Sequence, residues 1–178
     1  IIDIGCGLGG PARYFAKQFK CFIRGIDITP SFIEIGNKFN NLTSMSKQVS
    51  LQIGNGETLD FEDETFDGGY SQHVTMNIKN RKDFFLEAFR VLKKGTFFAF
   101  SEHGLGPKGN PIFPLPWADT SEMSFLLSPE STKSLLKEIG FYDIQIIETS
   151  EKYISGYEKM IDNKSKKDKP ILGIHVIG

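Results

Sequence analysis

The sequence predicts an α/β protein in which strands and helices alternate along the chain. The first ten residues read as a buried strand, a tight glycine turn and the start of a helix. Further strands are expected at residues 20–27, 49–53, 66–71, 96–102 and 141–148, and further helices at residues 30–42, 81–92, 129–139 and 151–161. No internal repeat or change of composition divides the 178 residues, so a single domain is expected over residues 1–178.

The glycine turn after the first strand is a candidate ligand site. Gly5, Gly7 and Gly9 alternate there. Glycine suits so sharp a turn because it adopts positive φ and has no Cβ to keep a ligand away. The following helix directs unpaired N–H groups and a partial positive charge at the turn. Gly5, Gly7 and Gly10 also match G-x-G-x-x-G, the pattern of a dinucleotide site. The turn predicts a bound ligand, with a ligand-free structural turn as the alternative.

Asp3 discriminates between the candidate ligands. It lies inside the first strand, two residues before Gly5, where a buried carboxylate needs a cationic or hydrogen-bonding partner. Such a carboxylate would repel a pyrophosphate, whereas it would hold the ammonium of an amino-acid-bearing ligand, directly or through water. Asp3 therefore favours a ligand with an amino-acid group over NAD.

Asp27 ends the second strand, about twenty residues after Gly5, which is the separation that places an acidic side chain beside a bound ribose. A carboxylate can accept hydrogen bonds from both ribose hydroxyls. The alternative role is a helix cap, although Thr29 and Pro30 already mark the start of the next helix. The apolar residues spaced for one face of that helix are Ile28, Phe32, Ile35 and Phe39.

Polar residues also follow the fourth and fifth strands. Gln72 and His73 leave the end of the fourth strand, and His103 follows the fifth. Open α/β sheets place ligands at such strand ends. Residues 103–120 then form a long loop whose aromatic and apolar content argues against disorder. We expect this loop to wall a substrate pocket; the alternative is a surface loop with Trp117 as its packing anchor.

Composition excludes several function classes. A net charge of −1 argues against an electrostatic nucleic-acid binder, and no apolar run approaches the roughly 20 residues that span a bilayer. Cys6 and Cys21 read as reduced cysteines, and the three histidines have no metal-ligand spacing, so no metal is expected. These features indicate a cytoplasmic enzyme. They say nothing about its oligomeric state.

Four segments in a fixed order resemble the class I S-adenosylmethionine (SAM) dependent methyltransferases of the small-molecule type, which include quinone and amine methyltransferases. They are motif I as Asp3-x-Gly5-x-Gly7-x-Gly9, the acid Asp27, the segment Gly54-Asn55-Gly56-Glu57, and Arg90-Val91-Leu92-Lys93 before the fifth strand. The resemblance covers residues 3–141. Its pattern has Pro where this chain has Asp60, and Pro where it has Lys94.

The resemblance implies a doubly wound, Rossmann-like, mainly parallel sheet with helices on both faces and the order 3-2-1-4-5-(7)-6. It also implies SAM as the cofactor. The residues that would bind it are Asp3, Gly5, Gly7, Gly9, Asp27, Asn55, Gly56 and Gln72. Asn55 and the backbone at Gly56 would face the adenine, since an amide offers both a donor and acceptors; an ordinary Asn-Gly turn is the alternative. In related enzymes a segment similar to residues 170–177 begins a helix and the seventh strand comes later, so the chain is expected to be cropped at both ends.

The function that follows is transfer of a methyl group from SAM to a small-molecule acceptor (an amine, a phenol or quinone, or a hydroxyl) by in-line displacement. His73 and His103 are the candidate general bases, because a histidine can take a proton near neutral pH. The alternative for each is a histidine that makes only local hydrogen bonds. A non-catalytic SAM-binding domain and an NAD-dependent oxidoreductase are the rival functions, and Asp3 counts against the second.

Overall fold

The structure, a computed structural model, describes residues 1–107 and 109–164. Its strands are β1 (Ile2–Ile4), β2 (Ile23–Asp27), β3 (Val49–Ile53), β4 (Gly69–Gln72) and β5 (Phe98–Ser101). Its helices are α1 (Gly10–Phe19), α2 (Pro30–Leu42), α3 (Arg81–Val91), α4 (Pro129–Ile139) and α5 (Ser150–Lys164), with the short 3-10 helices η1 (Thr75–Asn77) and η2 (Ser121–Met123). The chain divides into two compact units, Ile1–Tyr142 and Asp143–Gly178. The elements from β1 to α4 belong to the first unit, and α5 belongs to the second.

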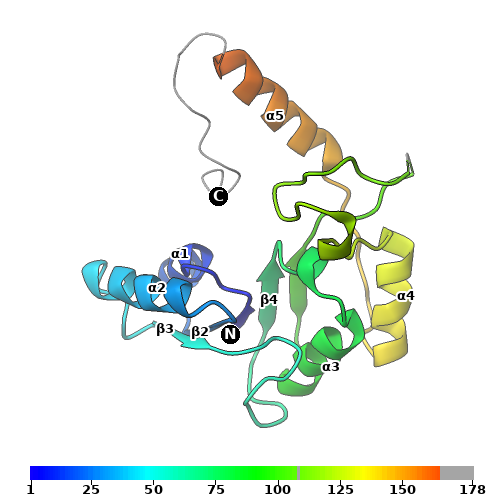
Figure 1. Ribbon diagram of the computed structural model, residues 1–178. Coiled ribbons are helices and arrows are strands. Elements are labelled where there is room, and N and C mark those ends of the chain that lie inside the picture. The colour runs from blue at the N-terminus through cyan, green and yellow to red at the C-terminus, as the bar shows by residue number, and fades with distance from the viewer. Residues whose placement is uncertain (108, 165–178) are drawn as a thin grey trace. The chain divides into compact units, whose positions relative to one another are not determined.

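The five strands form one parallel sheet in the order β3-β2-β1-β4-β5 (Figure 1). The chain begins at the central strand β1, moves outward through β2 to β3, and then crosses to the other side of β1 for β4 and β5. Helices α1 and α2 lie over one face of the sheet and α3 lies over the other (Figure 1). This arrangement confirms the predicted doubly wound, Rossmann-like fold.

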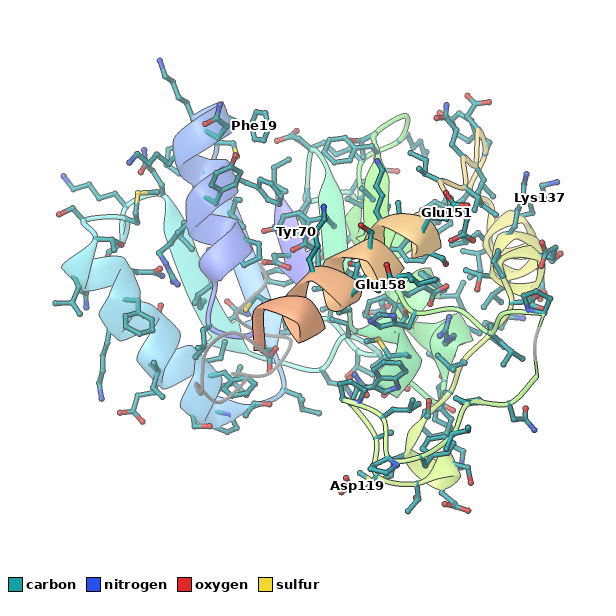
Figure 2. The ribbon with its side chains drawn as sticks, turned by 90° about the horizontal axis from the view of Figure 1, so that it is seen from above. Phe19, Tyr70, Asp119, Lys137, Glu151 and Glu158 are labelled. Atoms are coloured by element: carbon teal, nitrogen blue, oxygen red, sulfur yellow. The ribbon has the colours of Figure 1, made fainter. Side chains whose placement is uncertain are left out.

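The face beneath α1 and α2 is closed by small and branched apolar side chains. Ala12 and Ala16 of α1 are 0% exposed, and such small residues let the helix backbone lie close to the sheet. The other buried members of this cluster are Cys6, Ile23, Ile33, Val49, Leu51 and Tyr70. Figure 2 shows Tyr70 on the sheet and Phe19 at the end of α1, where its side chain is exposed. Packing on this face fixes the turn between β1 and α1.

The opposite face is closed by aromatic side chains. Phe84 and Phe85 of α3 are 0% exposed. The ring centroid of Phe85 lies 6.4 Å from that of Phe98 and 5.1 Å from that of Phe100, both on β5. Helix α4 packs against α3. The end of β5 is therefore held by α3, and this determines where the residues that follow β5 can lie.

The buried face of α2 differs from the predicted one. The four residues spaced for one apolar face are at least 40% exposed, and they are Ile28, Phe32, Ile35 and Phe39. The residues that α2 does bury are Ile33, Gly36 and Asn40. Asn40 Nδ2 donates to the Val49 carbonyl oxygen (3.1 Å), and its Oδ1 accepts from Arg13 Nη1 (3.0 Å). A Cβ on Gly36 would lie 2.9 Å from the Leu8 carbonyl oxygen. The orientation of α2 is therefore set by the close approach of the Gly36 and Leu8 backbones and by the hydrogen-bonded Asn40 amide. The spacing of apolar residues in the sequence indicates neither contact.

Residues 141–148 form no strand, so the predicted sixth strand is wrong, and β5 is an edge of the sheet in the part of the chain that the structure describes. Asp143 has φ 52, in the left-handed region, and this interrupts an extended run directly after Tyr142. Tyr142 and Ile147 are 71% and 79% exposed, so the apolar alternation of this segment is not matched by burial.

The predicted ends of α4 are confirmed. Ser131 N donates to the Ser128 cap oxygen (3.2 Å), Pro129 is the first helical residue, and Gly140 follows the helix with φ 122. Residues 170–177, the segment that resembles the start of a further helix in related enzymes, lie outside the described residues. Among the helices of residues 1–107 and 109–164, none has the length and apolar character needed to cross a bilayer.

Candidate functional site

The predicted site residues lie at one edge of the sheet. In a parallel sheet all strands point the same way, so the residues at their carboxyl ends meet at a common edge. Asp3 and Gly5 lie at this end of β1, Asp27 ends β2, Asn55 follows β3 and His73 follows β4. His103 likewise follows β5. The sheet order thus brings together residues that are up to a hundred positions apart.

The glycine turn has the geometry that the sequence predicted. Gly5, Gly7 and Gly9 have φ values of 84°, 52° and 72°, all in the region that disfavours other residues. A Cβ on Gly9 would lie 2.7 Å from Leu51 Cδ1, so packing explains this glycine. A Cβ on Gly7 would have no protein atom within 4 Å. Gly7 therefore faces open space, which is where a ligand could approach the backbone.

Asp27 is fixed beside that space by two backbone groups. Its Oδ2 accepts from Gly7 N (2.8 Å), and its Oδ1 accepts from Thr29 N (2.9 Å). A carboxylate has about four acceptor positions, so each oxygen retains capacity for a further donor. Asp27 joins the glycine turn to the start of α2, and it can also accept hydrogen bonds from a ligand at Gly7.

Asp3 is buried and bonded to a tyrosine. It is 2% exposed, and the Tyr70 hydroxyl donates to its Oδ2 (2.8 Å). Burial raises the pKa of Asp3 to about 7, the Tyr70 hydrogen bond opposes this, and the nearby charge of Asp27 adds to it. Tyr70 is thus a partner that the sequence did not identify, although β1 and β4 place it directly beside Asp3 in register. A cationic ligand group near Asp3 would favour its ionised form.

The segment after β3 makes a turn stabilised by its own side chain. Asn55 Oδ1 accepts from Glu57 N (3.0 Å), which is an Asx turn. A Cβ on Gly56 would lie 2.8 Å from the Phe84 ring and 2.9 Å from Ile4 Cγ2. Packing on α3 therefore requires glycine at this position, independently of any ligand.

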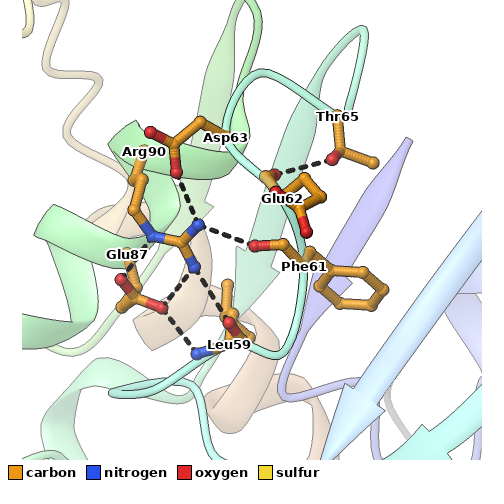
Figure 3. A network of polar contacts seen from close by, with 7 residues as sticks. All are labelled: Leu59, Phe61, Glu62, Asp63, Thr65, Glu87 and Arg90. Carbon is orange, nitrogen blue, oxygen red and sulfur yellow. Dashed lines mark hydrogen bonds and ion pairs between the residues drawn. The ribbon is translucent and has the colours of Figure 1, made fainter.

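The loop that continues from this turn is held on α3 by one arginine (Figure 3). Arg90 Nη1 donates to the Phe61 carbonyl and to Asp63, Nη2 donates to the Leu59 carbonyl, and both Nε and Nη2 donate to Glu87. Glu87 Oε2 also accepts from Leu59 N (2.6 Å). The Arg of the Arg90-Val91-Leu92-Lys93 segment thus fixes the loop behind the candidate adenine site, a role that the sequence did not predict.

The loop after β4 lies directly against the glycine turn. A Cβ on Gly5 would lie 2.2 Å from Val74 Cγ2, so only glycine permits this approach. His73 precedes Val74 and has φ 55, an uncommon conformation for a residue with a side chain. Its N–H donates to the carbonyl of Ser101, the last residue of β5 (2.8 Å). Gln72, the last residue of β4, is exposed at the same edge.

His73, His103 and Trp117 form an aromatic cluster at this edge. The two histidine rings lie 5.2 Å apart between centroids, and the His103 ring stacks on Trp117 at 4.6 Å with an angle of 5° between planes. Trp117 Nε1 donates to Ser124 Oγ (3.1 Å). Burial lowers the pKa of both histidines, and the neighbouring His73 lowers that of His103 further. Burial thus favours the neutral form of both imidazoles.

A family model described as a methyltransferase domain matches residues 2–100, more than half of the chain. The chain belongs to this methyltransferase domain family. The match confirms the family that the sequence predicted, and it spans the glycine turn, Asp27, the segment after β3 and the loop with His73.

Relatives of known name match this methyltransferase domain over different lengths. 24-Methylenesterol C-methyltransferase 3 of Arabidopsis thaliana is 32% identical over 102 residues, which are 57% of this chain and 28% of that protein. Phosphoethanolamine N-methyltransferase 1 of Arabidopsis thaliana is 24% identical over 172 residues, which are 94% of this chain and 33% of that protein. The chain thus spans about a third of the length of these relatives.

A solved structure shows the same fold. Phosphoethanolamine N-methyltransferase 2 of Haemonchus contortus, in complex with S-adenosyl-L-methionine, aligns with a TM-score of 0.80 over 94% of this chain and 39% of that chain. The sequence identity is 20%. This likeness establishes the arrangement of the sheet and helices that carries the candidate site.

Proposed function

We propose that this methyltransferase domain binds SAM at the glycine turn and transfers its methyl group to a small-molecule acceptor at the ends of β4 and β5. The observation that carries the proposal is the open space over Gly7 beside Asp27. A turn that leaves this space open has the shape of a ligand cradle, because a side chain at Gly7 would fill it.

The residues around that space fit the chemical groups of SAM. Asp3 matches the ammonium of the methionine part, directly or through water, and Gly5, Gly7 and Gly9 allow close approach of the ligand to the backbone. Asp27 matches the ribose hydroxyls. Asn55 and the backbone at Gly56 match the mixed donor and acceptor edge of adenine. Gln72 completes the assignment, as the exposed residue that ends β4.

The acceptor half of the site would orient the reactants and remove a proton. When bound, SAM supplies a methyl group on a sulfonium, which an acceptor atom displaces in line. Neutral His73 or His103 can accept the proton that an amine, phenol or hydroxyl acceptor releases. The loop of residues 103–117 would exclude water, since Trp117 turns back onto His103. Alignment of the acceptor is the larger task of the protein, and proton removal is the smaller one.

The relatives' names indicate the range of acceptors found in the family, from sterols to phosphoethanolamine. We propose an amine, a phenol or quinone, or a hydroxyl as the acceptor here. A single domain over residues 1–178 and a cytoplasmic location stay predictions.

Binding and turnover test the proposal separately. Calorimetric titration should give a SAM dissociation constant in the micromolar range, which corresponds to about −8 kcal/mol, and no binding of NADH. NADH binding without SAM binding would support the oxidoreductase instead. Incubation with methyl-labelled SAM and a metabolite extract, followed by mass spectrometry, should reveal a labelled small molecule. SAM binding without any labelled product would support the non-catalytic SAM-binding domain.

Asp27→Ala tests the ribose assignment. It should weaken SAM binding by about 1.5–3 kcal/mol, the range for a hydrogen bond to a charged group. Asp67→Ala is the matched control, because the Asp67 carboxylate is exposed and pairs only with the surface residue Lys93 among the described ion pairs. Equal SAM affinity in the two variants would show that Asp27 does not contact the ligand.

A further inference from the structure

One carboxylate, that of Glu102 next to His103 in the chain, joins three segments. Glu102 Oε2 accepts from Thr75 Oγ1 (2.6 Å) and from Arg81 Nη1 (2.6 Å), and Oε1 accepts from Thr132 Oγ1 (3.1 Å). Thr75 lies in η1, Arg81 begins α3 and Thr132 lies in α4. The exposed fractions of the Glu102 and Arg81 side chains are 13% and 4%, so this network is shielded from water.

The buried ion pair between Glu102 and Arg81 is not expected to add much to the free energy of unfolding. Charges taken out of water lose hydration, and a buried ion pair recovers that loss only when its remaining hydrogen-bonding groups are satisfied. Arg81 Nε and Nη2 are buried and have no hydrogen-bond partner among the residues that the structure describes. Apolar side chains of similar volume would hold these segments together at least as well. Stability therefore does not explain this ion pair and its hydrogen bonds. The position of Glu102 next to the two histidine-bearing loops suggests a different role.

Glu102 lies at the base of both histidine-bearing loops. His103 is the next residue in the chain, and Thr75 comes two residues after His73. His73 has a left-handed φ of 55°, a conformation that persists when the surrounding structure fixes it. Its own N–H is bonded to Ser101, and Thr75 beyond it is bonded to Glu102. Two successive residues of the β5 end thus hold the loop on both sides of His73.

We propose that Glu102 is a positioning residue that sets the spacing of His73 and His103 through its hydrogen bond to Thr75. The effect extends to Trp117, because the η1 residue Met76 accepts a backbone hydrogen bond from Phe125 (2.8 Å), and Trp117 is bonded to the adjacent Ser124. An effect of Glu102 on methyl transfer rests on the proposed function, whereas its effect on the spacing of His73 and His103 does not.

Two threonines on the same carboxylate give a matched test. Thr75→Val and Thr132→Val are isosteric, both residues are buried (1% and 5% exposed), and each variant removes one hydrogen bond to Glu102. Only Thr75 is attached to a histidine-bearing loop. If Glu102 positions the histidines, the two variants will differ; if it only stabilises the fold, they will behave alike.

Trp117 provides a readout that needs no substrate. It is the single tryptophan of the chain and stacks on His103, so its emission reports the histidine cluster directly. In Thr75→Val we expect a changed emission maximum and an acrylamide quenching constant raised at least about twofold. In Thr132→Val we expect both to match the wild type, and Thr75→Ser should restore them. Circular dichroism shows whether each variant is folded, and Thr75→Ala replaces Thr75→Val if the latter does not fold.

The rate of methyl transfer gives the second readout. With the acceptor identified from the extract, Thr75→Val should lower kcat about tenfold while the SAM dissociation constant stays unchanged, and Thr132→Val should leave both unchanged. Equal emission and equal kcat in the two valine variants would overturn the proposal. If wild-type protein binds no SAM, the proposed function fails, and the emission comparison still decides the role of Glu102.

Discussion

The carboxyl edge of the sheet has two halves that are held in different ways. On the β1–β2 side, the candidate cofactor residues are fixed by the backbone: glycines with positive φ form the turn, and Asp27 is held by the N–H groups of Gly7 and Thr29. On the β4–β5 side, the candidate acceptor residues lie on loops. Besides the backbone hydrogen bond from His73 to Ser101, the contacts around them are made by side chains, namely the stack on Trp117 and the Thr75 hydrogen bond to Glu102.

The difference has a physical consequence. Backbone groups within one turn are constrained by the covalent chain, so the cofactor half needs few other contacts to keep its shape. Loops lose more conformational entropy when they are ordered, and side-chain contacts must compensate for that loss. On the β1–β2 side, the cofactor half, we therefore expect substitutions within the glycine turn to have the largest effect on SAM binding. On the β4–β5 side, the acceptor half, we expect methyl transfer to respond also to substitutions outside the histidine-bearing loops.

The largest effect is expected at the cofactor turn. Gly7→Val should abolish measurable SAM binding and leave the domain folded, because the new side chain would occupy the open space beside Asp27. Calorimetry and circular dichroism provide the measurements. Gly109→Val is the matched control, since Gly109 also has positive φ (98°) and a Cβ there would meet no atom within 4 Å, but it lies in the loop after β5. Retained SAM binding in folded Gly7→Val would show that no ligand contacts this turn.

The second effect is a pH dependence of the cofactor half. Because burial raises the pKa of Asp3 to about 7, the free domain holds a proton on Asp3 below that pH. A ligand ammonium favours the carboxylate, so binding must release this proton. SAM affinity should therefore fall by up to about tenfold per unit as the pH drops below 7. Calorimetric titrations between about pH 5.5 and 8.5 would measure it.

Two variants, together with the pH dependence of the free energy of unfolding, test the predicted role of the Asp3 proton in SAM binding. Asp3→Asn should remove the pH dependence of SAM affinity. Tyr70→Phe removes the hydrogen bond that opposes the shift, so it should move the midpoint to higher pH. The folded pKa of Asp3 lies above its ordinary value of 3.8, so this group's contribution to the free energy of unfolding falls as the pH rises from about 4 to 7. A flat affinity profile in the wild type would exclude contact between Asp3 and the ammonium.

In the acceptor half, Trp117→Ala should lower kcat or raise the acceptor KM by about tenfold, with SAM affinity within error. The reason is loss of the ring that covers His103. Ile112→Ala is the control from the same loop, because its side chain is 90% exposed. Unfolding of Trp117→Ala would favour the packing-anchor role, for which about 3–5 kcal/mol is typical. A folded variant with an unchanged rate would place the loop outside the site.

The smallest effect is expected behind the cofactor half. Arg90→Lys keeps the charge but cannot reproduce the forked contacts to Glu87 and the loop carbonyls in Figure 3. Urea titration should show a loss of about 1 kcal/mol in the free energy of unfolding, since the guanidinium is partly exposed. SAM affinity should weaken only a few-fold. Arg24→Lys, at an exposed contact with Gln52, should change neither quantity.

The sequence alone determined the parts of this protein that depend on local chemistry. The order and type of the strands and α-helices from β1 to α4, the glycine turn and the bounds of α4 follow from patterns that span a few residues. The place of Asp27 beside the glycine turn was also predictable, because its separation from the turn is set by one βαβ unit. These features are encoded where they occur, so no distant partner is needed to predict them.

Tertiary structure decided the rest, because the deciding partners are far apart in the sequence. Tyr70 reaches Asp3 across 67 positions, and Thr132 reaches Glu102 across 30. The orientation of α2 was set by the amide of Asn40 and the close approach at Gly36, which outweighed an apolar stripe. Residues 141–148 have the alternation of a strand and form none. A strand needs a neighbour and a covering layer, and apolar alternation in one segment specifies neither.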